Sequence, residues 1–323
     1  MAKVLVADTF TGNALAALRA AFPGQVEVTS TFSPLAEQLA ETEYLLIRSR
    51  TKITPELIAQ APRLRLIVTA TSGFDHIDLS ACETRDIRVL FTPEANVTSV
   101  VELTFGLILT LFRRLNEMKP AIKSAKWKDD LSWGEELCGQ HLGIVGLGRI
   151  GSRVAQVAKA FGMEVAALDP YVSDETFSRL GVERMGLMEI LTSSDVLTLH
   201  VPYTKETHYL INHQTLPHMN PDAILVNTSR GPVVAETELV EALELKQLRG
   251  ACLDVFEREP VVHTSKMLNM ANVVMSCHVG AYTEQAFQRA SAVAVKKVID
   301  FHSTGEFSDS LPPPFPWYQP LPR

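Results

Sequence analysis

The sequence predicts an α/β protein built from two successive series of β-α units with parallel strands. Short apolar runs alternate with segments of helical periodicity along most of the chain, and this alternation is typical of parallel sheets covered by helices. The chain has 323 residues, more than the roughly 100–200 residues of one ordinary domain. A glycine-rich turn near the middle of the chain, between an apolar run and an amphipathic segment, marks the second series.

Composition and charge exclude several classes of protein. Hydrophobic residues make up 46% of the chain and charged residues 21%, close to the average of globular proteins, which excludes global disorder. The net charge of −7 argues against a dedicated binder of nucleic acid or of anionic membranes. The four cysteines are widely spaced without a C-x-x-C pair. We therefore expect neither a disulfide framework nor a metal site, and a cytoplasmic location fits best.

Two segments bear on export and on membranes. The N-terminal apolar run ends at Asp8 and lacks the longer apolar region of a signal peptide, so export is not expected. The most apolar window, Val100–Phe112, contains Glu102 and is far shorter than the roughly 20 residues that span a bilayer. We therefore expect no membrane partner.

The first series predicts one small α/β unit. Five apolar runs have the length and composition of strands: residues 4–7, 26–28, 44–47, 64–68 and 89–91. Between the first two runs, apolar residues recur at helical spacing from Ala14 to Phe22. The sequence Thr54-Pro55-Glu56 begins another helix, because Thr caps free amides, Pro fits the first helical position and Glu suits the positive end of a helix.

The middle of the chain predicts a long buried helix followed by the second series. From Thr98 to about Met118 the residues are apolar nearly all round, as in a helix that is buried on several sides at a domain or subunit contact. The second β-α series runs from His141 to about Ser276. The tail Leu311–Arg323 holds six prolines in thirteen residues, so we expect it to be extended or polyproline-like.

The glycine-rich turn predicts a dinucleotide site. Gly146, Gly148 and Gly151 form a G-x-G-x-x-G pattern between an apolar strand at 141–145 and an amphipathic helix. Such glycines allow a tight turn, a close approach to a pyrophosphate, and tight packing of a helix whose N-terminal amides bind the anion. The next strand ends at Asp169, where a carboxylate accepts hydrogen bonds from a ribose and repels a 2′-phosphate. NAD is therefore favoured over NADP.

Three downstream residues are candidates for chemistry beside such a cofactor. Arg230 follows the apolar strand 223–226, and an arginine at that edge can bind an α-keto acid with two parallel hydrogen bonds. Glu259 lies in the segment Leu253–Pro260, and His278 follows the predicted strand 273–275. Taken singly, each of the three is more often structural than catalytic.

Together, these segments resemble the D-isomer-specific 2-hydroxyacid dehydrogenases over nearly the whole chain. The matching segments follow one another in the family's order: Thr71–Asp78, Asn96–Glu102, Gly146–Gly151, Asp169-Pro170-Tyr171, His200–Thr204, Ser229-Arg230-Gly231, Asp254–Pro260 and His278-Val279-Gly280. One departure is Cys277, where the family commonly has Pro. The resemblance implies a Rossmann NAD-binding domain at 99–286, inserted into a flavodoxin-like substrate-binding domain made of residues 1–98 and 287–323.

The resemblance also implies an NAD-dependent enzyme that transfers a hydride between nicotinamide and a D-2-hydroxy acid or 2-keto acid. In that mechanism Arg230 holds the carboxylate and the carbonyl oxygen, His278 exchanges a proton with that oxygen, and Glu259 orients His278 and favours its charged form. Substrate contacts are implied for Arg48, Arg50, Ser72, Gly73, Asn96 and Arg230. Cofactor contacts are implied for Gly146, Gly148, Arg149, Ile150, Gly151, Asp169, His200, Pro202, Thr207, Thr228, Asp254 and Gly280, with Asp254 on the nicotinamide side.

The substrate is less well defined than the reaction. Residues Leu46–Ile53 resemble the corresponding segment of phosphoglycerate dehydrogenases. Arg48, Arg50 and Lys52 would lie on one face if the strand continued, at a strand end where ligands bind in α/β proteins. We therefore expect 3-phosphoglycerate and 3-phosphohydroxypyruvate as the substrate pair. Hydroxypyruvate or glyoxylate reductase and erythronate-4-phosphate dehydrogenase remain alternatives, because they share the catalytic residues.

Three further expectations concern assembly and regulation. The resemblance implies a homodimer, with the apolar helix Val100–Phe112 as physical support. Only 45 residues follow His278 (323 − 278), so a C-terminal regulatory domain of about 50 residues or more is not expected. A function of another class stays open, because corepressors of the C-terminal-binding-protein type resemble the same family and use the nucleotide-bound fold as a scaffold for proteins.

Overall fold

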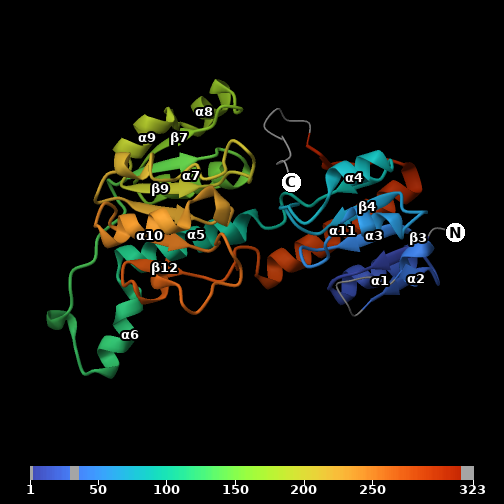
Figure 1. The fold of residues 1–323 in the computed structure, drawn as a ribbon, viewed down its shortest axis with the longest axis horizontal. Coiled ribbons are helices and arrows are strands. Elements are labelled where there is room, and N and C mark those ends of the chain that lie inside the picture. Colours follow the sequence, from blue (N-terminus) through green and yellow to red (C-terminus); the bar gives the residue numbers. More distant parts are fainter. Residues whose placement is uncertain (1–2, 30–35, 314–323) are drawn as a thin grey trace. The chain divides into compact units, whose positions relative to one another are not determined.

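The computed structural model describes residues 3–29 and 36–313 of the chain. Two compact units are present (Figure 1). The first combines the chain up to Asn96 with the segment that begins at Ala281, and the second runs from Val97 to Gly280. Each unit has its own sheet, so the prediction of an α/β fold with two β-α series is confirmed.

The sheet of the first unit has the strand order β13-β5-β4-β3-β1-β2. The strands are parallel except β13, which pairs antiparallel with β5. Read from the other edge, the first five strands have the order 2-1-3-4-5 of flavodoxin-like folds. The strands are β1 Lys3–Val6, β2 Val26–Val28, β3 Thr42–Ile47, β4 Leu66–Thr69, β5 Arg88–Leu90 and β13 Ser310–Leu311.

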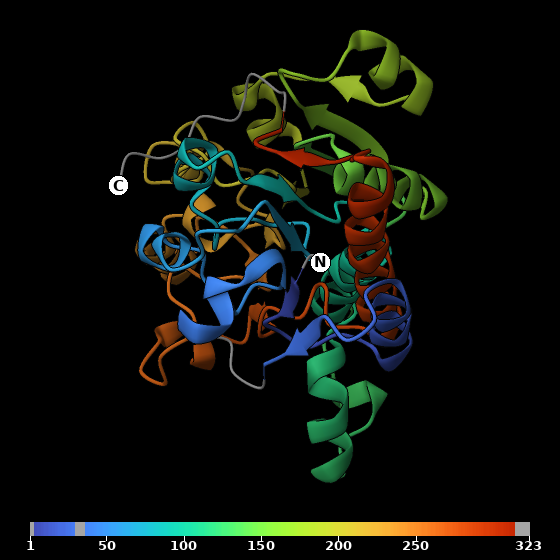
Figure 2. The same cartoon turned by 90° about the vertical axis from the view of Figure 1, so that its right-hand side faces the viewer.

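Helices cover both faces of this sheet, because successive strand residues point to opposite sides. Val4 packs in the core that contains residues of α1 and α11, while the next residue, Leu5, packs in the core that contains residues of α3 and α4. Helices α1 and α11 lie side by side (Figures 1 and 2). The helices of this unit are α1 Gly12–Ala21, α2 Ala36–Ala40, α3 Pro55–Ala59, α4 Leu79–Thr84 and α11 Glu284–Thr304.

The predicted helix start at Thr54 is confirmed. Thr54 is the N-cap of α3, its hydroxyl accepts a hydrogen bond from the amide of Leu57 at 3.3 Å, and Pro55 occupies the first helical position. Such a cap contributes about 1 kcal/mol to the stability of a helix end.

The sheet of the second unit has the order β12-β11-β10-β9-β6-β7-β8, and all its pairs are parallel. Numbered from β6, the first six strands have the order 3-2-1-4-5-6 of the Rossmann fold. The predicted Rossmann architecture is therefore confirmed. The strands are β6 His141–Val145, β7 Glu164–Leu168, β8 Glu183–Arg184, β9 Val196–Leu199, β10 Ile224–Asn227, β11 Gly250–Leu253 and β12 Val273–Met275.

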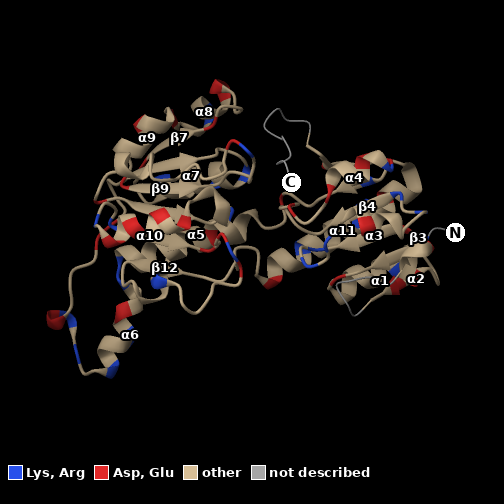
Figure 3. Cartoon of the chain, in the orientation of Figure 1, with Lys and Arg blue, Asp and Glu red and all other residues tan. Residues whose placement is uncertain are grey.

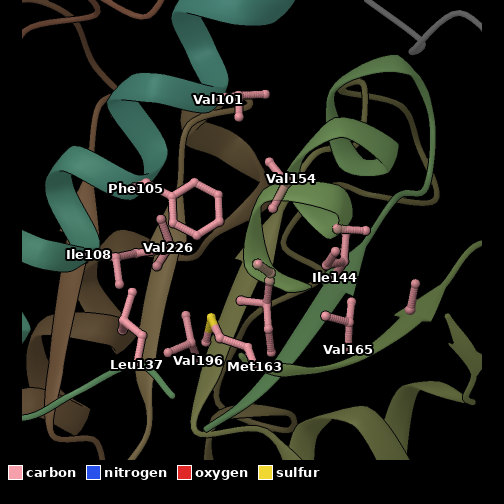
Figure 4. Packing of buried hydrophobic residues seen from close by; sticks show 14 of the residues in the cluster. Val101, Phe105, Ile108, Leu137, Ile144, Val154, Met163, Val165, Val196 and Val226 are labelled. Carbon is pink, nitrogen blue, oxygen red and sulfur yellow. The ribbon is translucent and has the colours of Figure 1, made fainter. Parts of the chain in front are cut away.

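Helices and short 3-10 turns connect these strands. The α-helices are α5 Val97–Phe112, α6 Leu115–Lys123, α7 Arg149–Ala160, α8 Asp174–Leu180, α9 Leu187–Ser193 and α10 Glu236–Glu244, and the 3-10 turns are η1 Lys128–Asp130, η2 Leu216–His218, η3 Gly231–Val233 and η4 Lys266–Asn269. Phe105 of α5 and Val154 of α7 pack with strand residues such as Ile144 in one buried cluster (Figure 4).

The single helix expected from Thr98 to about Met118 is two helices, so this prediction was wrong in its C-terminal part. Helix α5 ends at Phe112, and α6 starts at Leu115 after Arg114, which has a φ of 52°. A left-handed residue interrupts the helical hydrogen bonds. The burial of α5 on several sides agrees with its apolar pattern, since eight of its residues are buried.

Three further features concern the C-terminal tail, membrane spans and the distribution of charge. In the proline-rich tail, Leu311 belongs to β13, while residues 314–323 lie outside the described part of the chain. None of the described helices combines the length and apolarity that a bilayer span requires. Basic and acidic residues are interspersed over both units (Figure 3).

Candidate active site

His278 and Glu259 lie in direct contact in the second unit. The Nδ1 atom of His278 is 2.6 Å from Oε2 of Glu259. The other carboxylate oxygen, Oε1, accepts a hydrogen bond from the amide of Phe256 at 3.1 Å. The carboxylate is therefore held from both sides, and the imidazole is left with Nε2 as the ring nitrogen that can meet a ligand.

The backbone of His278 is also held in place. His278 follows β12, has a φ of 54°, and its amide donates to the carbonyl oxygen of Asp254 at 2.8 Å. A residue with a Cβ adopts this left-handed conformation at a cost, so the surrounding hydrogen bonds must impose it.

The carboxylate of Asp254 stabilises this conformation. Its side chain is buried, Oδ1 accepts from the hydroxyl of Ser276 at 2.6 Å and the amide of Val279 at 2.8 Å, and Oδ2 accepts from the amide of Gly280 at 2.9 Å. The carboxylate thus braces the loop that carries His278. No pattern in the sequence indicated a role for Ser276.

Arg230 lies in a turn that packs closely on the loop leading to Glu259. A Cβ added to Gly231 would lie 1.9 Å from the backbone carbonyl of Phe256, so only glycine permits this approach. The turn is closed by Asn227, whose side-chain amide donates to the carbonyl oxygen of Arg230 at 2.9 Å. The guanidinium group of Arg230 donates through Nη1 to the carbonyl oxygen of Ser229 at 2.7 Å. Arg230 follows β10, Glu259 follows β11 and His278 follows β12. These three strands are neighbours in the sheet, so the three residues come after the same ends of adjacent parallel strands.

The glycine turn after β6 has the geometry of a pyrophosphate cradle. Gly146 has a φ of 95°, and a Cβ there would lie 2.6 Å from the carbonyl oxygen of His200. A Cβ on Gly151 would lie 1.9 Å from the carbonyl oxygen of Gly146, whereas one on Gly148 would meet nothing within 4 Å. Space beside Gly148 is therefore open at the N-terminus of α7, and α7 begins with Arg149, Ile150 and Gly151 without an acidic residue in its first turn. The backbone amides at the N-terminus of a helix suit an anion.

Asp169 is held at the end of β7 by the same turn. Its Oδ2 accepts from the amide of Leu147 at 2.9 Å, and its Oδ1 accepts from the amide of Tyr171 at 2.9 Å. Oδ1 also accepts from the amide of Val172 at 3.2 Å, whereas Oδ2 accepts one bond from the described residues and keeps a lone pair for a ribose hydroxyl. Its fixed negative charge disfavours a 2′-phosphate.

The residues after β9 and β10 complete this sheet edge. His200 has a buried Nδ1 with no hydrogen-bond partner among the described residues, while Nε2 lies 3.0 Å from the hydroxyl of Thr198. Burial lowers the pKa of His200 to about 3. The hydroxyl of Thr207 donates to the carbonyl oxygen of Pro202 at 2.6 Å, and that of Thr228 lies 3.1 Å from the hydroxyl of Thr104. An orphaned buried nitrogen, an open glycine cradle and a fixed carboxylate together fit a dinucleotide such as NAD.

In the first unit, Ser72, Gly73 and Asn96 come together. The hydroxyl of Ser72 lies within hydrogen-bonding distance of Oδ1 of Asn96 and of the carbonyl oxygen of Pro93, the latter at 3.2 Å. The carbonyl oxygen of Gly73 accepts from the hydroxyl of Thr71 at 2.7 Å. The loop that the sequence predicts for carboxylate binding is therefore tied to the start of the segment at Asn96.

The three predicted phosphate-binding cations do not lie on one extended face, because β3 ends at Ile47 and a turn follows. The expectation that Arg48, Arg50 and Lys52 alternate on a continuing strand was wrong for this reason. Arg50 and Lys52 are both exposed.

Arg48 is tied instead to the body of its unit. Its Nε donates to the carbonyl oxygen of Thr9 at 2.9 Å, and its Nη2 donates to the carbonyl oxygen of Phe287 at 3.1 Å and the hydroxyl of Ser291 at 2.9 Å. Burial lowers the pKa of Arg48 to about 10, and burial also raises the pKa of Asp8, whose carboxylate accepts from the amide of Arg48. No local pattern in the sequence could show partners more than two hundred residues away.

Comparisons with known proteins agree with this geometry. Residues 105–280 match the family described as "D-isomer specific 2-hydroxyacid dehydrogenase, NAD binding domain". The chain is 37% identical over 314 residues to D-3-phosphoglycerate dehydrogenase of Methanocaldococcus jannaschii, covering 96% of this chain and 59% of that protein. It is 36% identical over 301 residues to the Bacillus subtilis protein of the same name, covering 93% and 57%. The chain thus spans less than two thirds of the length of these relatives.

Solved structures give the same result for the fold and the family. The D-lactate dehydrogenase of Aquifex aeolicus, complexed with NAD and lactic acid, is 33% identical with a TM-score of 0.83, and the match covers 93% of this chain and 95% of that one. The TT0316 protein of Thermus thermophilus is 33% identical with a TM-score of 0.86, covering 96% and 99%. With its NAD-binding domain at residues 105–280, the chain belongs to the D-isomer-specific 2-hydroxyacid dehydrogenase family.

Proposed function

We propose that the protein is an NAD-dependent oxidoreductase that interconverts a D-2-hydroxy acid and its 2-keto acid. The observation that carries this proposal is the contact of 2.6 Å between Nδ1 of His278 and Oε2 of Glu259. A carboxylate that accepts from Nδ1 orients the ring and leaves Nε2 to exchange a proton with a substrate oxygen.

In the proposed mechanism each residue has one task. Bound NADH supplies the hydride that reaches the carbonyl carbon. Nε2 of His278 gives its proton to the carbonyl oxygen and takes it back in the oxidative direction, and Glu259 holds the ring in place during both steps. The guanidinium group of Arg230 binds the carboxylate and the carbonyl oxygen, with backbone amides at Ser72 and Gly73 as further donors to the carboxylate.

The proposed substrate pair is 3-phosphoglycerate and 3-phosphohydroxypyruvate. The support is the identity of about 36–37% with D-3-phosphoglycerate dehydrogenases over more than nine tenths of the chain. Because Arg48 is bound to Thr9, Phe287 and Ser291, the exposed Arg50 and Lys52 are the better candidates for a phosphate.

A second candidate is a reductase of unphosphorylated keto acids such as hydroxypyruvate or glyoxylate. The observation that favours it is the same engagement of Arg48, which withdraws one of the three cations from any phosphate site. Such a substrate requires only Arg230 and the amides of the Ser72 loop.

One ratio separates the two candidates. We would measure kcat/KM for the NADH-dependent reduction of 3-phosphohydroxypyruvate and of hydroxypyruvate, which differ by one phosphate. A ratio above ten, about 1.4 kcal/mol of discrimination in the transition state, supports the phosphorylated substrate and should fall in Arg50→Gln but not in Arg63→Gln, an exposed arginine paired with Glu41. A ratio near one supports the second candidate.

The domain assignment follows from this function. We propose that residues 1–98 and 287–323 bind substrate and that residues 99–286 bind NAD.

The four cysteines are free thiols, and a reducing cytoplasm suits such a protein. Localisation of a tagged protein by fluorescence tests this last point.

We also propose a homodimer, with support from a region other than the one the apolar pattern suggested. Helix α5 packs within its own unit, whereas the segment after it exposes large apolar side chains. These are Leu115, Ile122, Trp127 and Trp133, which are 51%, 63%, 67% and 96% exposed. Such exposure is unusual for a monomer. Sedimentation at micromolar concentration should give a dimer, and Trp133→Ser should weaken it while the exposed control Leu245→Ser should not.

A further inference from the structure

A chain of hydrogen bonds connects His76 to the loop that carries Ser72 and Gly73. Nε2 of His76 is 3.1 Å from the hydroxyl oxygen of Thr69, that oxygen is 2.6 Å from the hydroxyl oxygen of Thr71, and the Thr71 hydroxyl donates to the carbonyl oxygen of Gly73 at 2.7 Å. Thr69 is completely buried and His76 is only 8% exposed. Four groups from the end of β4 and the following turn are thus joined in one line.

The carbonyl group at one end fixes the direction of the whole chain. A carbonyl oxygen can only accept, so the single hydroxyl proton of Thr71 points to Gly73. Thr71 must then accept from Thr69 across the contact of 2.6 Å. The Thr69 proton is used in that bond, so Thr69 can only accept from His76. The ring of His76 must therefore carry a proton on Nε2.

The backbone of His76 is anchored independently of its ring. Its carbonyl oxygen accepts from the amide of Ile53 at 2.9 Å, and the amide of Asp78 donates to the carbonyl oxygen of Ile53 at 2.9 Å. The loop above it has a second support, because the amide of Thr92 donates to the carbonyl oxygen of Thr71 at 3.1 Å. Because the backbone of His76 is anchored and Thr69 belongs to β4, the bonds through Thr71 hold the carbonyl group of Gly73 against fixed partners.

We propose that His76 is a positioning residue for substrate binding and acts with a proton on Nε2 through Thr69 and Thr71. It holds the carbonyl group of Gly73, and through this anchor it holds the loop on which the amides of Ser72 and Gly73 lie. The inference rests on the proposed function, in which those amides bind the substrate carboxylate. His76 itself touches neither the substrate nor the cofactor in this proposal.

The first test reads the proton itself and needs no enzymatic activity. Long-range ¹H–¹⁵N spectra of the ¹⁵N-labelled wild-type protein separate protonated from unprotonated ring nitrogens, and the signal that disappears in His76→Gln identifies His76 among the nine histidines. We expect a protonated Nε2. An unprotonated Nε2 would overturn the direction derived above, whether or not the protein reduces any keto acid.

The second test separates positioning from stability. His76→Phe keeps a planar ring but removes the donor, and Thr69→Val removes the hydroxyl that passes the bond on. Each should raise the KM for 3-phosphohydroxypyruvate and for hydroxypyruvate about tenfold or more, the order of effect of a lost buried hydrogen bond. The dissociation constant of NADH, measured by fluorescence, should stay within about twofold, because the cofactor residues lie in the other unit.

Conservative rescue and non-additivity make this test specific. The side-chain amide of His76→Gln can replace the Nε2–H donor, so this variant should have a KM within about threefold of wild type. The double variant His76→Phe/Thr69→Val should be no worse than either single one, since both break one chain. His263→Phe, at an exposed histidine, controls for the added ring. An unchanged KM in folded His76→Phe, judged by thermal unfolding, would contradict the proposal. If wild type reduces no keto acid at all, the proposed function fails while the spectra still test the proton on His76.

Discussion

Nδ1 of His278 and Oε2 of Glu259 are 2.6 Å apart, and Oε1 of the same carboxylate is bound by the amide of Phe256. The carboxylate therefore bridges the ring to the backbone of its own loop. Such a bridge restrains both the tilt of the imidazole and the choice of nitrogen that faces the substrate.

This bridge predicts a defined loss on removal of the charge. Glu259→Gln keeps the size of the side chain but no longer offers a carboxylate to Nδ1. We expect kcat for keto acid reduction to fall by about 10- to 100-fold, at or below the lower limit for general acid–base catalysis, because the proton donor itself remains. NADH affinity should be unchanged. Glu244→Gln, at a surface residue paired with Lys266, is the matched control, and an equal loss in both variants would argue against a role for Glu259.

Two glycines of the cradle should separate stability from cofactor binding. A Cβ on Gly151 would overlap the carbonyl oxygen of Gly146 at 1.9 Å, whereas a Cβ on Gly148 meets nothing within 4 Å. Gly151→Ala should therefore lower the free energy of unfolding by about 1–3 kcal/mol. Gly148→Ala should leave stability unchanged but weaken NADH binding about tenfold or more, because its methyl group occupies the space for the pyrophosphate.

Thermal unfolding and fluorescence titration with NADH check this pair. Gly106→Ala is the control, since its Cβ also meets nothing within 4 Å and it lies in α5. Unaltered NADH binding by Gly148→Ala would mean that the dinucleotide does not approach the turn at this residue.

Asp169 predicts the choice of cofactor. Its carboxylate is held by the amides of Leu147 and Tyr171, so its charge cannot swing away from a 2′-phosphate. Asp169→Ser should lower the ratio of kcat/KM for NADH to that for NADPH about tenfold or more, through lost ribose contacts and lost repulsion. Asp129→Ser, at an exposed residue of η1, should keep the wild-type ratio. The idea fails if Asp169→Ser discriminates as strongly as the wild type.

Burial of His200 predicts a pH dependence of stability. Its pKa is lowered to about 3 in the folded protein, whereas an unfolded histidine has a pKa of about 6.5. Below that value the unfolded chain binds a proton that the folded chain does not, so stability is fully present above about pH 6.5 and is lost as the pH falls toward 3. Relative to His200→Gln, the wild-type free energy of unfolding should fall by up to about 2 kcal/mol between pH 7 and pH 5.

Urea unfolding of both proteins at several pH values measures this difference. His263→Gln removes an exposed histidine and should follow the wild type throughout. Parallel curves for the wild type and His200→Gln would show that His200 is protonated equally in both states.

Local patterns predicted those parts of the fold and site that neighbours in the sequence determine. The turn from Gly146 to Gly151 was predictable because the backbone leaves no room for a Cβ at either of these two glycines, and Asp169 because it follows a strand at a fixed distance. The cap at Thr54 was predictable for the same reason. Arg230 and His278 could be named as strand-end residues, but their joint role came only with the family resemblance.

The predictions that were wrong concern features that no local pattern in the sequence marks. Arg48 reads as a free cation beside a strand, yet its side chain is bound by Phe287 and Ser291 of α11. The break between α5 and α6 falls at Arg114 without a glycine or proline to mark it. Similarly, nothing near His76 indicates that the ring is buried against Thr69, because tertiary packing decides which hydroxyl groups face each other.

The most direct test of the account is the rate of NADH oxidation by wild type and by His278→Gln, with 3-phosphohydroxypyruvate, hydroxypyruvate and glyoxylate as oxidants. Loss of the proton donor should lower kcat for the preferred keto acid by about 10²- to 10⁴-fold, while the dissociation constant of NADH stays within about twofold of wild type. Equal turnover by both proteins would contradict proton transfer by His278. Tight NADH binding without turnover of any keto acid would favour a nucleotide-bound scaffold over an enzyme.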